Sequence, residues 1–478
     1  MPLRSRFTTF CLAIVALFLA STTAAGERPN LILIVTDDQG LESVSAYGNS
    51  AIRTPNIDSL ASAGARFTRG FTSSASCSVS RSVLLTGLHG HASGMYGHVH
   101  AYHHFSVYDE VKALPVRLEE TGYRTARIGK YHLAPEEVFH FQQDLGQGKG
   151  TPGHPISRST VEMAEAAREF IGRDPEQPFF LYFAPLDPHR EGPNSTTEPN
   201  SFGNRPDGYP GAPPEIYDPA DVAVPYFLPD LPGVRRETAE YYRSVSRIDK
   251  GVGKLVEILK ETGNWANTVI VYLADNGYAQ PNAKTTLYDS GARLPLIVRT
   301  PDQPGEGRVS DAMVSWVDIT PTLLDYAGVP VDPAEFNGIS QRPVLNGAKE
   351  SVREEVYGSH TFHEITMYYP MRMVRTDRYK LIWNPAAALT YPTASDSHYS
   401  LTRAEITAMD KPMVGNRSWE DYRHRDVVEL YDVSTDPEEL KNLAEHPDYI
   451  VVRDQLIEKL KAFQAETKDP WIVKWEYE

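Results

Sequence analysis

Cys77 lies in a short run of residues that could carry nucleophilic chemistry. The run 76–87 reads Ser-Cys-Ser-Val-Ser-Arg-Ser-Val-Leu-Leu-Thr-Gly and places Arg81 four residues after the thiol. The second cysteine of the chain, Cys11, falls within an N-terminal segment that has the layout of an export signal. Once that segment is removed, Cys77 has no partner for a disulfide. The sequence then leaves two interpretations, a buried thiol that packs as a small hydrophobe or a reactive residue.

A second group of residues offers only oxygen donors. Asp37 and Asp38 are adjacent in the chain, and Asp275 and Asn276 form a second adjacent pair. Carboxylate and amide oxygens suit a hard cation, with Ca²⁺ favoured before Mg²⁺. Each pair alone is also common in turns and helix caps. The hypothesis of a metal site therefore depends on the two pairs lying close together.

The elements around these residues predict how they are positioned. Near-continuous apolar runs at 31–35, 179–183, 268–273 and 294–298 are typical of strands in a sheet covered on both faces. Helical patterns at 159–171 and 236–262 alternate with them, which indicates an α/β fold. Three of the strands lead into Asp37, into Asp187 and His189, and into Asp275. Since polar ligands collect at the carboxyl ends of strands, we expect these residues to meet.

The rest of the chain indicates a division into parts. Residues 1–25 are predicted to be an export signal, 26–350 a catalytic domain, and 351–478 a smaller α+β domain with short strands near 356–358, 371–374, 380–383 and 429–433 and a helix over 449–467. The apolar residues after Cys77 predict a helix that begins just beyond it, and a further strand at 125–128 precedes Lys130. The stretch 192–234, rich in Pro and Gly, is predicted to be a long surface excursion.

Composition limits the class of partner and the compartment. The 478 residues carry a formal net charge of −16, which argues against nucleic acid and favours a small pocket over an open groove for a polyanion. The apolar run at 10–19 is too short to cross a bilayer, and we expect no membrane association. We therefore expect an exported protein, periplasmic or secreted in a bacterium and lysosomal if the source is eukaryotic. The oligomeric state stays open, with a homodimer among the alternatives.

Several motifs together resemble the type I, formylglycine-dependent sulfatases. They are Cys-x-x-Ser-Arg with Leu-Thr-Gly at 77–87, Arg-Pro-Asn-Leu-Ile-Leu-Ile-Val-Thr-Asp-Asp at 28–38, Thr-Pro-Asn-Ile-Asp at 54–58, Gly-Lys-Tyr-His at 129–132 and Asp-Asn-Gly at 275–277. Their order and spacing match over nearly the whole mature chain. The resemblance implies an alkaline-phosphatase-like α/β fold, with a large mixed sheet flanked by helices and a smaller C-terminal α+β domain.

The same resemblance implies the chemistry of the site. A formylglycine-generating enzyme would oxidise Cys77 to formylglycine (3-oxoalanine), whose aldehyde hydrate attacks sulfur. Four oxygen ligands would bind Ca²⁺ together with residue 77, and Arg81 would hold the hydrate. The four ligands are Asp37, Asp38, Asp275 and Asn276.

Four further residues take catalytic roles by the same resemblance. Lys130 would contact the sulfate, and His132 would act as the base that regenerates the aldehyde. His189 and Lys284 would assist the leaving group, which needs a proton before it departs. Taken separately, each of these residues is also compatible with an ordinary surface or hydrogen-bonded position.

A narrower set of strings resembles the heparan N-sulfatases. They lie at 94–97, 103–105, 187–190, 217–219, 224–227, 363–367, 369–372 and 466–471. This resemblance implies hydrolysis of the N-sulfate of a non-reducing-end glucosamine in heparan sulfate or heparin fragments, in a closed pocket. The residues implied in sugar recognition are His104, Arg190, His363, Glu364 and Arg372. The histidine-rich stretch 89–104 could line the pocket, stabilise a loop or form a second metal site.

Two positions depart from these patterns, and three alternatives stay open. Val79 stands where sulfatases usually carry Pro or Ala, a position read by the maturing enzyme, and Lys284 stands where the N-sulfatase pattern tends to have Arg. An O-sulfatase acting on a glycan or an aryl ester would share the catalytic set. A phosphoester or phosphonate hydrolase is a further option on the same scaffold. If Cys77 is not matured, the chain would be a non-catalytic binder of Ca²⁺ and sulfated glycan.

Overall fold

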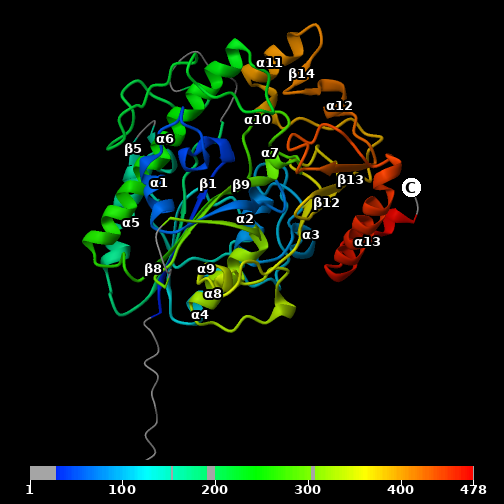
Figure 1. Cartoon of the computed structure of the whole chain (residues 1–478). Coiled ribbons are helices and arrows are strands. Elements are labelled where there is room, and N and C mark those ends of the chain that lie inside the picture. Colours follow the sequence, from blue (N-terminus) through cyan, green and yellow to red (C-terminus); the bar gives the residue numbers. More distant parts are fainter. Residues whose placement is uncertain (1–27, 152–153, 191–199, 303–306, 477–478) are drawn as a thin grey trace, which may run out of the picture.

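The main feature of the fold is an eight-stranded mixed sheet, in the order β10-β2-β9-β8-β1-β7-β3-β4 (Figure 1). The structure is a computed structural model that describes residues 28–151, 154–190, 200–302 and 307–476, so the predicted export signal lies outside the described residues. The strands are β1 (Asn30–Thr36), β2 (Ala65–Phe71), β3 (Arg124–Gly129), β4 (Gln143–Asp144), β7 (Phe179–Ala184), β8 (Thr268–Ala274), β9 (Arg293–Arg299) and β10 (Arg308–Ser315).

The centre of this sheet is parallel. β8, β1, β7 and β3 run side by side in one direction, with Thr36 of β1 opposite Ala274 of β8. Every residue of β1, β7 and β8 is buried, as expected for apolar strands covered on both faces. β9 runs antiparallel to both of its neighbours, which makes the sheet mixed. The four strands predicted from apolar runs are confirmed.

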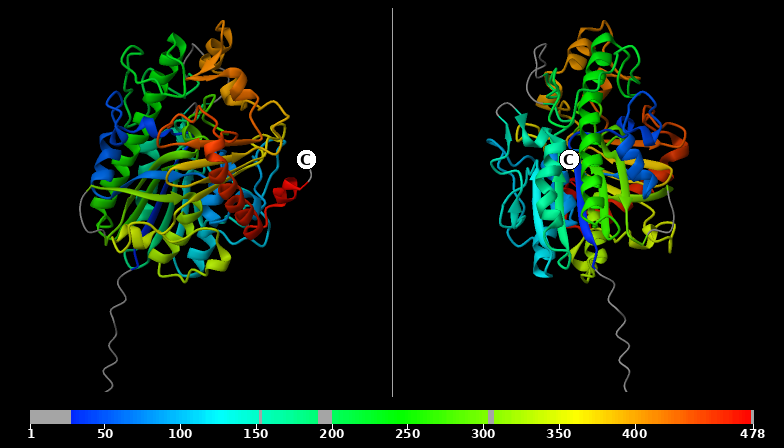
Figure 2. Two further views of the ribbon diagram at one scale, coloured as in Figure 1. Left: turned by 45° about the vertical axis from the view of Figure 1, so that its right-hand side comes forward. Right: turned by 90° about the vertical axis from the view of Figure 1, so that its left-hand side faces the viewer.

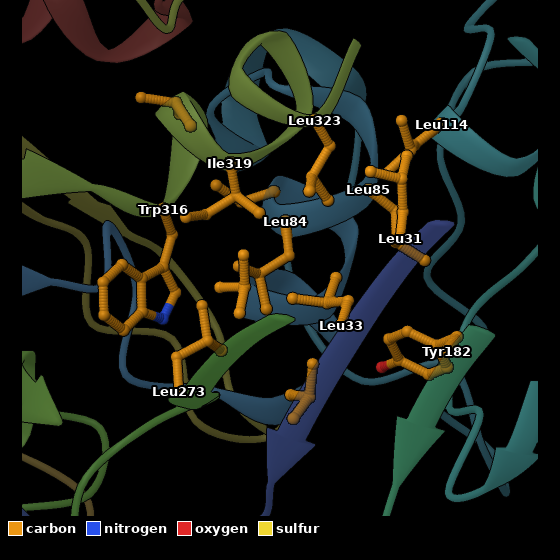
Figure 3. Close-up of a cluster of buried hydrophobic side chains, with 14 of the residues drawn as sticks. Leu31, Leu33, Leu84, Leu85, Leu114, Tyr182, Leu273, Trp316, Ile319 and Leu323 are labelled. Carbon is orange, nitrogen blue, oxygen red and sulfur yellow. The ribbon is translucent and has the colours of Figure 1, made fainter. Parts of the chain in front are cut away.

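Helices cover both faces of the sheet. On one face α1 (Pro55–Ser62), α5 (Thr160–Gly172) and α6 (Pro232–Glu261) share a hydrophobic core with the strands. On the other face lie α2 (Cys77–Thr86), α4 (Leu114–Glu120) and α8 (Ile319–Tyr326). Figure 2 shows the long α6 (green) running along one face of the sheet. Figure 3 shows Leu84 and Leu85 of α2 beside Leu31 and Leu33 of β1.

The C-terminal part forms a second, antiparallel sheet. Its strands, in spatial order, are β11 (Val356–His360), β12 (Met371–Arg375), β13 (Tyr379–Trp383) and β16 (Val428–Asp432). The helix α13 (Ile450–Glu466) packs against this sheet through Leu456, Leu460 and Phe463 (Figure 1). The predicted change of pattern after residue 350 is therefore present in the structure.

Shorter elements fill the connections. They are α3 (Gly90–Ser93), α7 (Asp289–Ala292), α9 (Arg342–Leu345), α10 (Ser395–His398), α11 (Leu401–Ala408), α12 (Trp419–Arg423), β5 (Gly150–Thr151), β6 (His154–Pro155), β14 (Met413–Val414) and β15 (Arg417–Ser418). None of the helices in the described ranges has the length and apolar character needed to cross a bilayer.

The structure differs from the sequence-based expectation in three places. α6 begins at Pro232, earlier than predicted, because a proline at the first position of a helix lacks only an N–H that would be unpaired there. The described part of the expected surface excursion, 200–231, is partly buried, since Phe202, Tyr217 and Phe227 pack against α6. The strands β2 and β10 were not predicted, because polar residues interrupt their apolar pattern.

Candidate active site

The carboxyl ends of four parallel strands bring the candidate residues to one edge of the large sheet. Asp37 and Asp38 follow β1, and Asp275 and Asn276 follow the neighbouring β8. The backbone N–H of Asp275 donates to the carbonyl of Thr36 at 3.0 Å, which fixes the two pairs side by side. On the other side of β1, the segment after β7 carries His189 and the segment after β3 carries Lys130 and His132. The structure confirms the sequence-based expectation that these residues lie close together.

Three carboxylates form the centre of the site. Asp37, Asp38 and Asp275 are fully buried and each has an oxygen within 4.8 Å of the others. Loss of hydration raises the pKa of Asp38 to about 7, the charge on Lys284 opposes this rise, and the charges of Asp37 and Asp275 add to it. Asp38 also has a backbone φ of 63°, which is uncommon for a residue other than glycine. The arrangement concentrates negative charge in a buried position, where it must be balanced by donors and cations.

Asn276 completes an oxygen donor set. Its side-chain nitrogen donates to Asp38 Oδ1 at 2.6 Å, whereas its Oδ1 is buried and has no hydrogen-bond partner among the described residues. A buried carbonyl oxygen without a donor is costly unless something else binds it. Together with the three carboxylates it matches the all-oxygen ligation that Ca²⁺ prefers. The residues present therefore fit a hard divalent cation.

Cys77 is the first residue of α2 and lies beside this donor set. Its Sγ is 3.6 Å from Asp37 Oδ1 and 3.9 Å from Asp38 Oδ1. The helix N-terminus places the positive end of the helix dipole at residue 77, as the sequence predicted. Burial nevertheless raises the pKa of the Cys77 thiol well above its usual value. An unmodified Cys77 is therefore a protonated thiol and a weak nucleophile.

Arg81 lies one helical turn further along α2 and is fully buried. Its Nε and Nη2 contact Asp275 Oδ2 at 2.9 and 2.7 Å, and its Nη1 donates to the hydroxyl of Tyr182 at 3.0 Å. Arg81 is not among the residues that line the adjacent cavity. Its guanidinium therefore neutralises the carboxylate cluster from the side that faces away from the cavity.

The two candidate lysines approach the cluster from the cavity side. Lys130 Nζ donates to Asp37 Oδ2 at 2.5 Å, and Lys284 Nζ donates to Asp38 Oδ2 at 2.8 Å. Lys284 Nζ also contacts Asp396 Oδ2 at 2.5 Å. Despite its burial, Lys284 has a pKa raised well above the usual value by the surrounding carboxylates. Both lysines are therefore charged and face the space above Cys77.

The two candidate histidines also line this space. His189 Nε2 is 3.7 Å from Asp38 Oδ2 and 3.8 Å from Asp396 Oδ2. His132 has a backbone φ of 58°, and its Nε2 lies 2.5 Å from His100 Nδ1. Burial lowers the pKa of both rings well below the usual value, and nearby lysines lower it further. Both rings are therefore neutral and available to exchange protons.

These side chains surround a cavity of about 560 Å³, a volume typical of small-molecule sites. Its lining residues are Cys77, His98, His100, Ala101, Tyr102, His103, Lys130, His132, Leu186, His189, Arg190, Lys284, His363, Glu364, Ser395, Asp396 and Tyr399. Asp396 was not predicted, because it is 112 residues from Lys284 in the chain and belongs to no recognisable motif. His98 and His100 could have been singled out only through the histidine-rich stretch that contains them.

Comparisons with known proteins agree with this geometry. The family model described as Sulfatase matches residues 29–329, which span both the large sheet and Cys77. The chain belongs to the sulfatase family. A second model, N-sulphoglucosamine sulphohydrolase, C-terminal, matches residues 281–388 of this sulfatase.

Individual relatives of the sulfatase extend the comparison. N-sulphoglucosamine sulphohydrolase from Homo sapiens is 37% identical, with 96% of this chain and 94% of the relative covered. An ulvan-active sulfatase from Formosa agariphila is 28% identical, with 92% and 81% covered. A solved protein in complex with its substrate D-glucosamine-2-N,6-O-disulfate aligns with a TM-score of 0.67 at 22% identity, covering 94% of this chain and 100% of that one. The expected sulfatase fold is confirmed.

Three of the five residues expected to recognise a sugar line the cavity, and two do not. Arg190, His363 and Glu364 are lining residues. His104 is exposed in the same loop as His103 but outside the cavity lining. Arg372 is fully buried within β12, where its Nη2 donates to Asp469 Oδ1 at 2.8 Å and its Nη1 donates to the carbonyl of His360 at 2.8 Å. Their positions do not support a role in sugar binding for His104 or Arg372.

Removal of Asn276 Oδ1 should weaken Ca²⁺ binding by the sulfatase. We expect Asn276→Ala to raise the Kd for Ca²⁺ at least about tenfold, because it removes one unpartnered oxygen of the donor set. Calorimetric titration of the chelator-treated protein measures this directly. Ca²⁺ should also raise the thermal midpoint of the wild type, since a ligand that binds only the folded state stabilises it. Asn416→Ala, at an exposed asparagine, serves as the control, and equal Kd values for the two variants would contradict the assignment.

Arg372 should behave as a structural residue. Arg372→Ala leaves Asp469 buried without its partner, which costs about 3–5 kcal/mol of unfolding free energy. The matched control Arg173→Ala breaks an exposed ion pair with Glu169 and should cost no more than about 1 kcal/mol. Chemical denaturation of both variants checks the difference. A rise in KM for substrate in Arg372→Ala, with unchanged stability, would restore the sugar-binding interpretation.

Proposed function

We propose that this sulfatase hydrolyses the N-sulfate of a non-reducing-end glucosamine in heparan sulfate or heparin fragments. The observation that carries the proposal is the cavity, which is lined by Cys77, Lys130, Lys284, His132 and His189. The oxygen donor set lies directly behind Cys77. The choice of substrate is supported by the 37% identical relative, which is named N-sulphoglucosamine sulphohydrolase. The matching C-terminal family model over residues 281–388 supports the same choice.

The reaction needs a nucleophile and an electrophilic sulfur. Formylglycine at position 77 would supply a nucleophilic hydrate oxygen, and Ca²⁺ held by Asp37, Asp38, Asp275 and Asn276 would polarise the sulfate. Burial keeps the unmodified thiol of Cys77 protonated, which supports a requirement for this maturation by a formylglycine-generating enzyme.

Lys130 and Lys284 would bind the sulfate group. Each ammonium group has three donors, and each already uses some of them on a carboxylate of the donor set. The carboxylates hold the two Nζ atoms at fixed places above Cys77, so the lysines need little reorganisation when an anion enters. The remaining donors can then stabilise negative charge as it develops on the sulfate oxygens.

His132, His189 and Lys284 would move the protons. The neutral ring of His132 can accept a proton at residue 77, as a base does. The leaving glucosamine nitrogen must gain a proton as the N–S bond breaks. Lys284 is charged, contacts both Asp38 and Asp396, and would donate that proton. His189 lies 3.8 Å from Asp396 Oδ2, and its neutral ring would assist by hydrogen bonding to the leaving nitrogen.

The outer part of the cavity would hold the sugar. Arg190 donates to Glu237 through Nη1 at 2.7 Å, while its Nε and Nη2 have no partner among the described residues. Glu364 and Asp396 add acceptors for hydroxyl or amine groups on the same lining. A cavity of this size suits one terminal residue, which agrees with the acidic net charge of the chain. We also propose that the protein is exported, where it would meet such saccharides.

Sulfate release distinguishes the proposal from the alternatives. We expect the chain purified from its native host to release sulfate from glucosamine N-sulfate and not from glucosamine 6-sulfate, with Cys77→Ala as the blank. Release only from the 6-sulfate would make the protein an O-sulfatase, which shares the same catalytic set. The peptide that contains Cys77 should be about 18 Da lighter than its thiol form, and an unmodified thiol there would instead support the non-catalytic binder.

The two catalytic histidines should be separable from other histidines by kinetics. His132→Ala and His189→Ala should each lower kcat about 10²–10⁴-fold at saturating substrate, because each removes a proton-transfer group. His446→Ala, at an exposed ring near α13, is the matched control and should keep wild-type turnover. Unchanged kcat in both active-site variants would overturn the assigned roles.

A further inference from the structure

Four imidazole rings gather on one wall of the cavity. The ring centroids of His98, His100 and His132 lie 5.0, 4.9 and 4.6 Å apart in pairs. The ring of His363 lies 3.9 Å from that of His98, and the two Nε2 atoms are 3.0 Å apart. The proposed mechanism gives no task to His98 or His100. Their convergence on His132 therefore needs a separate explanation.

We propose that His98, His100 and His132 form a binding site for a transition-metal cation of the Zn²⁺ class. One ring nitrogen from each of the three lies within 4.8 Å of the others. In a tetrahedral zinc site with Zn–N distances of about 2.0–2.1 Å, the nitrogens lie roughly 3.4 Å apart. Small rotations of the rings would bring them to this separation, and the fourth position would stay open toward the cavity.

The donor chemistry separates this site from the oxygen donor set at Cys77. Three imidazole nitrogens suit Zn²⁺, Cu²⁺ or Ni²⁺, whereas carboxylates and an amide suit Ca²⁺. Burial also lowers the pKa of each of the three rings, so that their nitrogens are not blocked by protons. The two sets of ligands share no residue, and each can be tested without the other.

The surroundings of the rings favour binding. His98 is buried, and its ring is oriented by Ser78 Oγ, 3.4 Å from Nδ1, and by His363 Nε2, 3.0 Å from Nε2. A metal bound at Nε2 would replace the contact with His363. His100 is exposed and gives an ion access from solvent. His132 Nε2 already faces His100 Nδ1 at 2.5 Å. The site thus combines a buried, oriented ring (His98), a ring that solvent can reach (His100) and a third ring (His132) whose nitrogen points toward them.

Occupation of this site would inhibit the enzyme. This consequence rests on the proposed function, in which His132 is the base that accepts a proton. A bound ion would occupy the lone pair of His132 and add positive charge beside Lys130. A free divalent transition-metal ion would therefore inhibit the enzyme by binding within the cavity.

Zn²⁺ binding should be measured independently of turnover. The chain with Cys77→Ala, saturated with Ca²⁺, is titrated with Zn²⁺ by calorimetry and with Co²⁺ by visible absorption, so that neither the thiol nor maturation enters the result. We expect one equivalent of Zn²⁺, with affinity lowered about tenfold or more by His98→Gln and by His100→Gln. His104→Gln, an exposed histidine in the same loop outside the cavity lining, is the matched control.

Two results would overturn the proposal. One is the lack of stoichiometric Zn²⁺ binding, and the other is binding that survives both substitutions. The exposed position of His100 keeps the test valid if His98→Gln fails to fold. In the matured wild type, Zn²⁺ should lower kcat/KM about tenfold, and His100→Gln should relieve this relative to its own metal-free rate. Absence of any turnover would refute the proposed function but leave the binding result intact.

Discussion

Three carboxylates that must lie side by side in a buried position impose the charge balance on which the site depends. Asp37, Asp38 and Asp275 cannot all ionise there without positive charge nearby, and the raised pKa of Asp38 records that difficulty. Arg81 supplies charge from beneath the cluster, and Lys130 and Lys284 supply it from the cavity side. The same two lysines also line the cavity. In the proposed function one arrangement therefore serves both charge compensation and anion binding.

The sheet provides the rigidity that this arrangement needs. The parallel register of β1 and β8 places the two adjacent acidic pairs at one edge, and the apolar side chains of both strands leave no freedom to shift. The leucines of α2 pack against β1, so Cys77 is fixed at the start of a buried helix (Figure 3). Catalytic positions held by strands and a buried helix are more precise than positions held by loops.

The outer wall of the cavity has a different origin. His363 and Glu364 follow β11, and Asp396 belongs to α10, all within the part of the chain that forms the antiparallel sheet. Lys284 joins the two parts, since its ammonium contacts both Asp38 and Asp396. The large sheet therefore positions Cys77 and the carboxylates, whereas the C-terminal part supplies much of the cavity wall opposite them.

The sequence by itself determined the strands at the centre of the sheet and the polar residues at their carboxyl ends, which the structure brings together beside Cys77. Apolar runs and strand-end polar residues are local signals, and β1, β7 and β8 follow them closely. Only the tertiary structure decided that Arg372 pairs with Asp469, that His104 lies outside the cavity, and that Asp396, His98 and His100 line it. These contacts join segments far apart in the chain. Their geometry depends on how whole elements pack, which no local pattern of residues encodes.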